Sequence, residues 1–310
     1  MSNLRALWLT FPLLASTPAW ATRYDCDADR AALRQAATLS HSTVVDATSL
    51  PIVPDKVPVI SAGLDEGLRL AQGASGSARS LDTGARKRAA EMDAGVKASS
   101  ELKIKELADP ITAERIRWQR LSADYEDLKM KVDGLPDGES KPLRPLLAKA
   151  LVALQSAAEA LRPLEESIKI MSAQALEMKE ARDDARGSLE EITTHTAGVI
   201  LRAEEMPAPL VEAKARLGAL GQEPRDVNRS RAWEKLDLLR GITRLLFEAA
   251  DRACNRANDF RRNSNGYENA AGSFETTRRT ASAGPAGVKS KLDEAQKALT
   301  FVRERLKNPG

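Results

Sequence analysis

Apolar residues recur every three and four positions along most of the chain, a spacing typical of helices packed side by side. The longest such stretch runs from Leu143 to Glu205. Because the repeat persists for so long, it predicts helices that supercoil around one another. Pro163 lies inside the stretch, so we expect a kink or break near Leu161, and the charged Arg182 falls at a seam position. One seam position holds Leu147, Leu154, Leu161, Ile168, Ala175 and Leu189, and the other holds Ala150, Ala157, Leu164, Met171, Met178, Ala185, Ile192 and Val199.

Three more stretches show the same spacing. The first opens at Asp109-Pro110, where an N-cap precedes a proline at the first helical position, and it ends in the turn residues 134–138. The second runs from about Asn228 to Arg262. The third covers roughly Tyr267 to Leu306 and is expected to break at Gly284-Pro285.

Two short links with proline, residues 206–209 and 221–224, enclose a predicted short helix from Leu210 to Leu220. Short links between helices favour antiparallel neighbours. We therefore expect the long helices to run up and down the molecule.

The N-terminal third is less regular. A helix is predicted from Cys26 to Leu39, and the three prolines of the segment Leu50 to Ile60 predict an extended strap. From Ile60 to Leu107 the repeat continues with alanine and glycine at many positions. Since glycine lowers helix stability, this stretch is predicted either to be the most mobile helix or to lie very close to a neighbour.

The pattern as a whole predicts an all-α, elongated antiparallel helical bundle with coiled-coil-like long helices. We divide the chain into a signal peptide (1–21), an N-terminal helix with its proline-rich strap (22–60) and a long helical bundle (61–310). The composition agrees, because only 4% of the 310 residues are aromatic, and a core poor in rings and rich in alanine suits close helix packing better than a β-sandwich.

Residues 1–21 have the features of a secretory signal peptide: Arg5, an apolar core at 6–15 and an A-x-A cleavage site at 19–21. A retained membrane anchor is the alternative. The apolar core is shorter than the ~20 residues that cross a bilayer, and no later stretch is long enough, so no integral span is expected after cleavage. The chain is thus predicted to be periplasmic or secreted, and a peripheral contact with the envelope stays open.

The chain has two cysteines, Cys26 and Cys254. In an oxidising compartment two such residues are expected to pair, and a disulfide here would tie the mature N-terminus to a distant part of the chain. Unpaired thiols or an intermolecular bond are the alternatives. Neither cysteine has a C-x-x-C partner, so a metal site is not expected.

The sequence contains no Walker loop, G-x-S-x-G elbow, H-E-x-x-H pair or haem motif. His195 follows Glu191 by one turn, which is more typical of an exposed polar pair than of a metal site. Ser100 and Lys103 match the S-x-x-K spacing without its companion motifs. The net charge of +3, or +2 after loss of Arg5, does not favour nucleic acid. We therefore predict no enzymatic activity, no cofactor, no metal and no nucleic-acid partner.

One basic feature suggests a partner. Arginines gather between residues 225 and 279, and arginine grips carboxylates and phosphates well. The reading as a docking surface for an acidic protein or a phosphorylated lipid competes with that of a solvated helix face laced with local ion pairs. The residues concerned are Arg240, Arg244, Arg252, Arg256, Arg261 and Arg262.

These features predict an exported, non-enzymatic helical protein with a structural or interaction role, acting on protein partners in a bacterial envelope or secretion assembly. Two alternatives stay open. A membrane-acting helical toxin or effector would need a concealed apolar hairpin, for which the strap from Leu50 to Ile60 is the candidate. A periplasmic chaperone would grasp clients between its helices.

Overall fold

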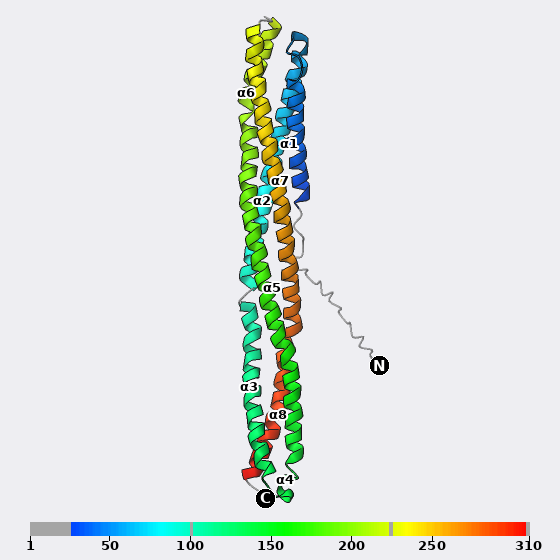
Figure 1. The fold of residues 1–310 in the computed structure, drawn as a ribbon, viewed down its shortest axis with the longest axis vertical. Helices are drawn as coiled ribbons and strands as arrows, with labels where there is room; N and C mark the ends of the chain where they lie inside the picture. Colours follow the sequence, from blue (N-terminus) through cyan, green and yellow to red (C-terminus); the bar gives the residue numbers. More distant parts are fainter. Residues whose placement is uncertain (1–25, 100–101, 223–225, 308–310) are drawn as a thin grey trace, which may run out of the picture.

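A computed structural model describes residues 26–99, 102–222 and 226–307. All the regular secondary structure in these ranges is helical, and the helices form a long narrow rod (Figure 1). The predicted all-α bundle of long helices is therefore confirmed. The predicted signal peptide lies outside the described residues.

The first two helices form an antiparallel pair, α1 (Asp27–Thr48) and α2 (Val57–Ser99), joined by a link that contains the short 3-10 helix η2 (Pro54–Lys56). The helix predicted from Cys26 to Leu39 is confirmed and extends further. The extended strap predicted over Leu50 to Ile60 is wrong from Pro54 onwards, because the chain is helical there, first in η2 and then in α2. Pro58 fits the first turn of α2, where a backbone N–H has no partner in the helix.

Helix α3 (Leu102–Asp133) begins earlier than predicted. Asp109-Pro110 is not its start, because Pro110 lies inside the helix and is exposed. Ile104 and Leu107 precede the proline and pack on the core, so apolar burial offsets the one backbone hydrogen bond that proline removes. The predicted end at residues 134–138 is confirmed: the chain turns there, through the short α4 (Asp137–Ser140).

Helix α5 (Arg144–Glu205) continues through Pro163, so of the predicted kink or break near Leu161 the break is wrong. Leu161 is fully buried, while Pro163 faces solvent. The next helix, α6 (Pro207–Gln222), does not reverse the chain. Its Leu210 N–H donates to the carbonyl of Met206 at 3.1 Å, which carries the helical pattern across the link at 206–209. The antiparallel turn expected at that link is therefore wrong, and the chain reverses only after α6 (Figure 1).

Helices α7 (Asp226–Ser282) and α8 (Gly284–Lys307) return along α6 and α5. The predicted boundary between Arg262 and Tyr267 is wrong, because α7 runs through both residues without interruption. The break expected at Gly284-Pro285 is confirmed.

The return of α7 and α8 along α5 and α6 keeps one register for the whole length of the rod. From one contact to the next, the residue number falls along α5 and α6 by nearly as much as it rises along α7 and α8. The junctions between α5 and α6 and between α7 and α8 do not shift it. The contacts that mark this register are Lys235 with Glu212 (2.9 Å), Arg256 with Glu191 (2.5 Å), the Nζ of Lys291 with the carbonyl of Ser156 (3.1 Å) and Lys149 with Glu294 (3.3 Å).

The number of packed helices changes along the rod. Towards its α6 end, α1 packs against α2 and α7, which also contact α5 and α6. Towards its α4 end, α3, α5 and α8 pack on one another, and α1 does not reach them (Figure 1). The rod therefore passes from four helices to three near Cys26, where α1 begins.

Glycines of α2 allow α1 to approach closely. A Cβ atom added to Gly63 would lie 2.7 Å from the Cβ of Ala47, and one added to Gly67 would overlap Val44. Gly73 has nothing within 4 Å of the same position. Of the two alternatives predicted for this stretch, close packing against a neighbour is therefore the one observed at the glycines that face α1.

Replacing Pro163 by alanine is expected to stabilise the protein by about 1–3 kcal/mol, because the new N–H can donate to the carbonyl of Glu159 inside α5. Pro145 is equally exposed but lies in the first turn of α5, where an N–H gains no helical partner. Pro145→Ala is therefore the matched control and should change stability little. Urea denaturation of the two variants measures the difference, and equal midpoints would contradict the interpretation.

Candidate functional site

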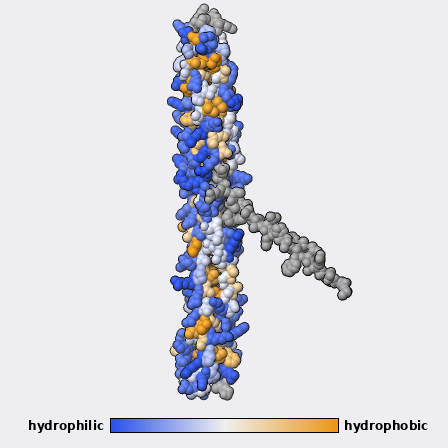
Figure 2. Space-filling view, turned by 90° about the vertical axis from the view of Figure 1, so that its right-hand side faces the viewer, coloured by the Kyte–Doolittle hydropathy of each residue, from blue (hydrophilic) through white to orange (hydrophobic). Residues whose placement is uncertain are grey.

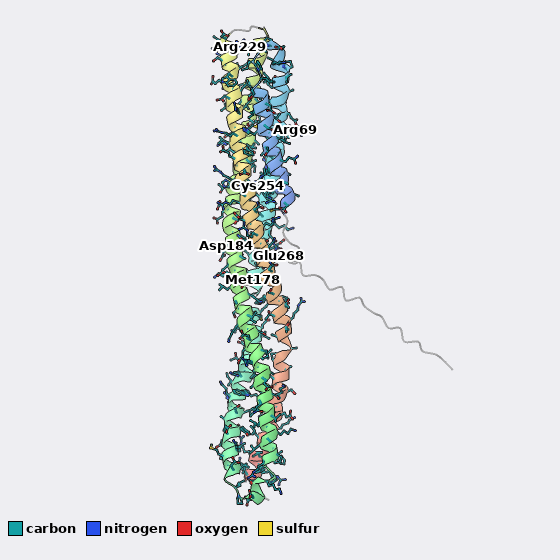
Figure 3. The ribbon with its side chains drawn as sticks, turned by 45° about the vertical axis from the view of Figure 1, so that its right-hand side comes forward. Arg69, Met178, Asp184, Arg229, Cys254 and Glu268 are labelled. Carbon is teal, nitrogen blue, oxygen red and sulfur yellow. The ribbon has the colours of Figure 1, made fainter. Side chains whose placement is uncertain are left out.

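The start of α1 brings the two cysteines to the same place. Cys26 and Cys254 are both buried, and both are free thiols in this structure, so the predicted disulfide is not formed in it. The sulfur of Cys26 lies 3.6 Å from the carbonyl of Ala257, and that of Cys254 lies 3.3 Å from the carbonyl of Arg30. Each thiol thus contacts the helix that carries the other, about one turn apart along the contact of α1 with α7. Figure 3 shows Cys254 beside the beginning of α1.

Burial makes both thiols weak acids. It raises the pKa of Cys254 to about 11, and the neighbouring Cys26 contributes to this increase. Burial also raises the pKa of Cys26, although the positive charge of Arg30 opposes it. Because the thiolate is the reactive form, the folded protein keeps both sulfurs chemically quiet.

A buried ion pair closes the space directly beyond α1. Arg88 of α2 is 4% exposed and bonds to three partners: Glu268, Ser264 at 2.9 Å and Glu91 at 3.1 Å. The Glu268 side chain is 9% exposed, so both charges of the main pair are removed from water. Since a buried charge is tolerated only when it is paired and hydrogen-bonded, this arrangement fixes α2 against α7 at one register. Figure 3 shows Glu268 further towards the α4 end than Cys254.

A second group of charges lies next to this pair on α5. Arg182, the predicted charged seam residue, is partly buried and contacts Asp93 of α2 at 3.6 Å and Asp183 at 2.8 Å. Arg186 also reaches Asp93, at 2.7 Å. The middle of the rod is therefore held by ion pairs across three helices, where α1 no longer contributes to the core.

The six candidate arginines do not form one free basic surface. Three of them make ion pairs within the rod, and a fourth, Arg244, lies 3.8 Å from Glu248. Arg240 and Arg252 make no ion pair with the residues that the structure describes. The geometry thus resembles the solvated, ion-paired face more than a docking surface. The pairs are Arg256 with Glu191 and Asp259, Arg261 with Asp27, and Arg262 with Asp259.

Four of these arginines lie near the two histidines: Arg240 and Arg244 near His41, and Arg252 and Arg256 near His195. His41 of α1 stacks on Phe247 and contacts the hydroxyl of Thr243 at 3.1 Å. Burial lowers the pKa of His41, and the charges of Arg240 and Arg244 lower it further.

The pKa of His195 in α5 is shifted in the same direction. Burial lowers its pKa, Arg252 and Arg256 lower it further, and Glu191 opposes them. The predicted interpretation of Glu191 and His195 as a polar surface pair fits this environment.

Both ends of the rod carry hollows lined by apolar side chains together with a few polar or charged ones. At the α6 end, Leu50, Pro51 and Ile52 face Trp233 around a hollow of about 490 Å³. Trp233 is 46% exposed there. At the α4 end, a hollow of about 350 Å³ is lined mainly by Leu135, Pro142, Leu143, Leu146, Phe301 and Leu306.

One face of the rod shows how its exposed apolar side chains are distributed. Figure 2 shows small, separate hydrophobic patches among mostly hydrophilic side chains on the face in view. Within the described ranges, no group of acidic, histidine or cysteine side chains has a spacing that would hold a metal ion. No helix in the same ranges is long and apolar enough to cross a bilayer.

Comparison with protein-family models, with curated proteins and with solved structures gives no match for this chain. The residues in the structure must therefore carry any functional argument. The sequence analysis missed Arg88 and Glu268, which are far apart in the chain. The available signal was an arginine at a heptad position that holds Gly67, Ala74 and Leu81 in the preceding repeats.

Removing one partner of the buried pair should be costly. Glu268→Ala leaves Arg88 with only partial compensation and is expected to destabilise the protein by about 3 kcal/mol. Glu66→Ala removes an exposed partner of Arg69 on the same helix as Arg88 and should leave the urea midpoint nearly unchanged. If the two variants unfold at the same urea concentration, the pair does not hold the register as described.

Replacing Arg240 and Arg244 by alanine should raise the pKa of His41, measured by NMR titration, because two positive charges beside the ring are lost. His195, which faces Arg252 and Arg256, is the internal control. The folded pKa of His41 lies below the unfolded value of 6.5, so its contribution to stability is complete above that value and is lost as the pH falls through the folded pKa. The variant should lose less stability on acidification, and an unmoved His41 titration would contradict this assignment.

Proposed function

We propose that the protein is an exported, non-enzymatic helical rod that connects protein partners in a bacterial envelope or secretion assembly. The observation that carries this proposal is a long narrow rod with partly apolar hollows at both ends. Helices α5 and α6 together run from Arg144 to Gln222, which corresponds to a length of ~120 Å at ~1.5 Å per residue. A rod of this length suits a spacer that holds two partners apart.

The two ends have the chemistry of contact sites. Exposed aromatic residues surrounded by aliphatic side chains are typical anchors of protein interfaces. Trp233 at the α6 end and Phe301 at the α4 end are both nearly half exposed. The ion-paired middle of the rod has the composition of a surface that stays in water.

Export is part of the proposal. It rests on the signal-like residues 1–21, and it implies that the mature chain begins at Thr22 in the periplasm or outside the cell. In that compartment Cys26 and Cys254 would form an intramolecular disulfide, since they already lie together at the start of α1.

Site-specific photo-crosslinking in intact cells tests the contact sites. A photoreactive residue at Trp233 or Phe301 should give discrete adducts with other envelope proteins, while one at the exposed Asp184 in the middle of the rod should not. Equal adducts at all three positions, or none at either end, would contradict the proposal.

Fractionation of the same cells tests the location. Mass spectrometry should find a mature chain that starts at Thr22 in the periplasmic or secreted fraction. Failure of the purified protein to release dye from liposomes would argue against the membrane-acting alternative, and failure to suppress client aggregation would argue against the chaperone.

A further inference from the structure

Helix α1 packs against α2 and α7 mainly through small side chains. Only two large apolar side chains, Leu33 and Val44, are among its buried residues, and the others are alanine, serine or threonine. Small side chains bury little apolar area, so they contribute little free energy to the docking of α1. At its edges Arg34 pairs with Asp251 at 2.7 Å, but both side chains are nearly half exposed. An exposed ion pair adds little to stability.

The rest of the rod does not need α1. Towards the α4 end, α3, α5 and α8 pack on one another as a three-helix arrangement without α1. If α1 left its place, α2, α5 and α7 would remain as a similar three-helix arrangement with the same register. The Arg88–Glu268 pair lies just beyond α1 and would still hold α2 to α7.

The two thiols lie at the N-terminal end of α1, where it meets α7. Cys26 is 2% exposed and Cys254 is fully buried, and each contacts the backbone of the facing helix. The other end of α1 continues into the link at 49–56, which contains two prolines. Release of α1 from α7 would therefore expose both sulfurs, with the link acting as the hinge.

We propose that α1 is a latch that opens independently of the rest of the rod, and that a disulfide between Cys26 and Cys254 locks it shut. The disulfide lock rests on the export proposed above, because it needs an oxidising compartment. Opening of α1 does not depend on that proposal. On locking, two S–H bonds break and one S–S bond forms, and two protons and two electrons pass to a disulfide oxidant such as oxidised glutathione. Reduction reverses the step and frees α1.

Thiol labelling of the reduced full-length mature chain tests the latch. Gly67→Ala places a methyl group against Val44 only when α1 is docked, whereas Gly73→Ala adds the same group where nothing lies within 4 Å. Both changes favour the helical form of α2. Labelling by a thiol reagent should accelerate about tenfold or more in Gly67→Ala, since overpacking penalises the docked state, and should remain at the wild-type rate in Gly73→Ala.

The dependence on urea distinguishes latch opening from global unfolding. Opening of α1 exposes much less surface than unfolding of the whole rod, so labelling of both cysteines should depend less steeply on urea than global unfolding and be faster than global unfolding allows. Labelling that follows the far-UV circular dichroism transition, with both glycine variants behaving alike, would overturn the latch.

Oxidation tests the lock separately. After treatment with oxidised glutathione, hydrogen exchange of the α1 amides should slow by about tenfold or more, while that of the α3 amides should stay unchanged. Unchanged exchange in α1 would overturn the lock. Both experiments use purified protein, so they can fail or succeed independently of the crosslinking and fractionation results that test the proposed function.

Discussion

The register between the long helices is the constraint on which the structure depends. Helices α5 and α6 stay aligned with α7 and α8 across two helix junctions. The alignment extends from the ion pair of Lys149 with Glu294 to that of Glu212 with Lys235. Each seam position contributes a small increment of apolar burial, and a slip of one residue would rotate every one of them out of the core. Local interruptions, such as Pro163, are therefore tolerated because the neighbouring seam residues continue to pack.

The same constraint explains how far the sequence predicted the fold. One series of α5 seam residues, such as Met171 and Ile192, is buried as the heptad spacing predicts. Helix boundaries were less predictable, because Pro110 and the residues after Arg262 resemble ends when only local propensity is considered. The polar run that contains Ser264 and Glu268 stays helical because Arg88, from a distant part of the chain, satisfies it.

The candidate site was only partly visible in the sequence. The cysteines could be predicted to meet from their compartment, and the structure places them on facing helices at the start of α1. The arginine-rich stretch of α7 looked like a docking surface, but partners such as Asp27 and Glu191 come from other helices. Charge composition alone could not show that pairing, because it depends on which helix faces which.

The distribution of polar groups along the rod follows from the change from four helices to three. Where α1 begins, the core loses one of its helices, and the charged groups of Arg88 and Glu268 occupy the gap instead of alanine and leucine. Because both charges must be desolvated, such a pair adds little net stability, and we infer that its role is to fix the alignment of α2 with α7. It also separates the two ends of the rod: α1 can loosen at the α6 end without disturbing the three helices at the α4 end.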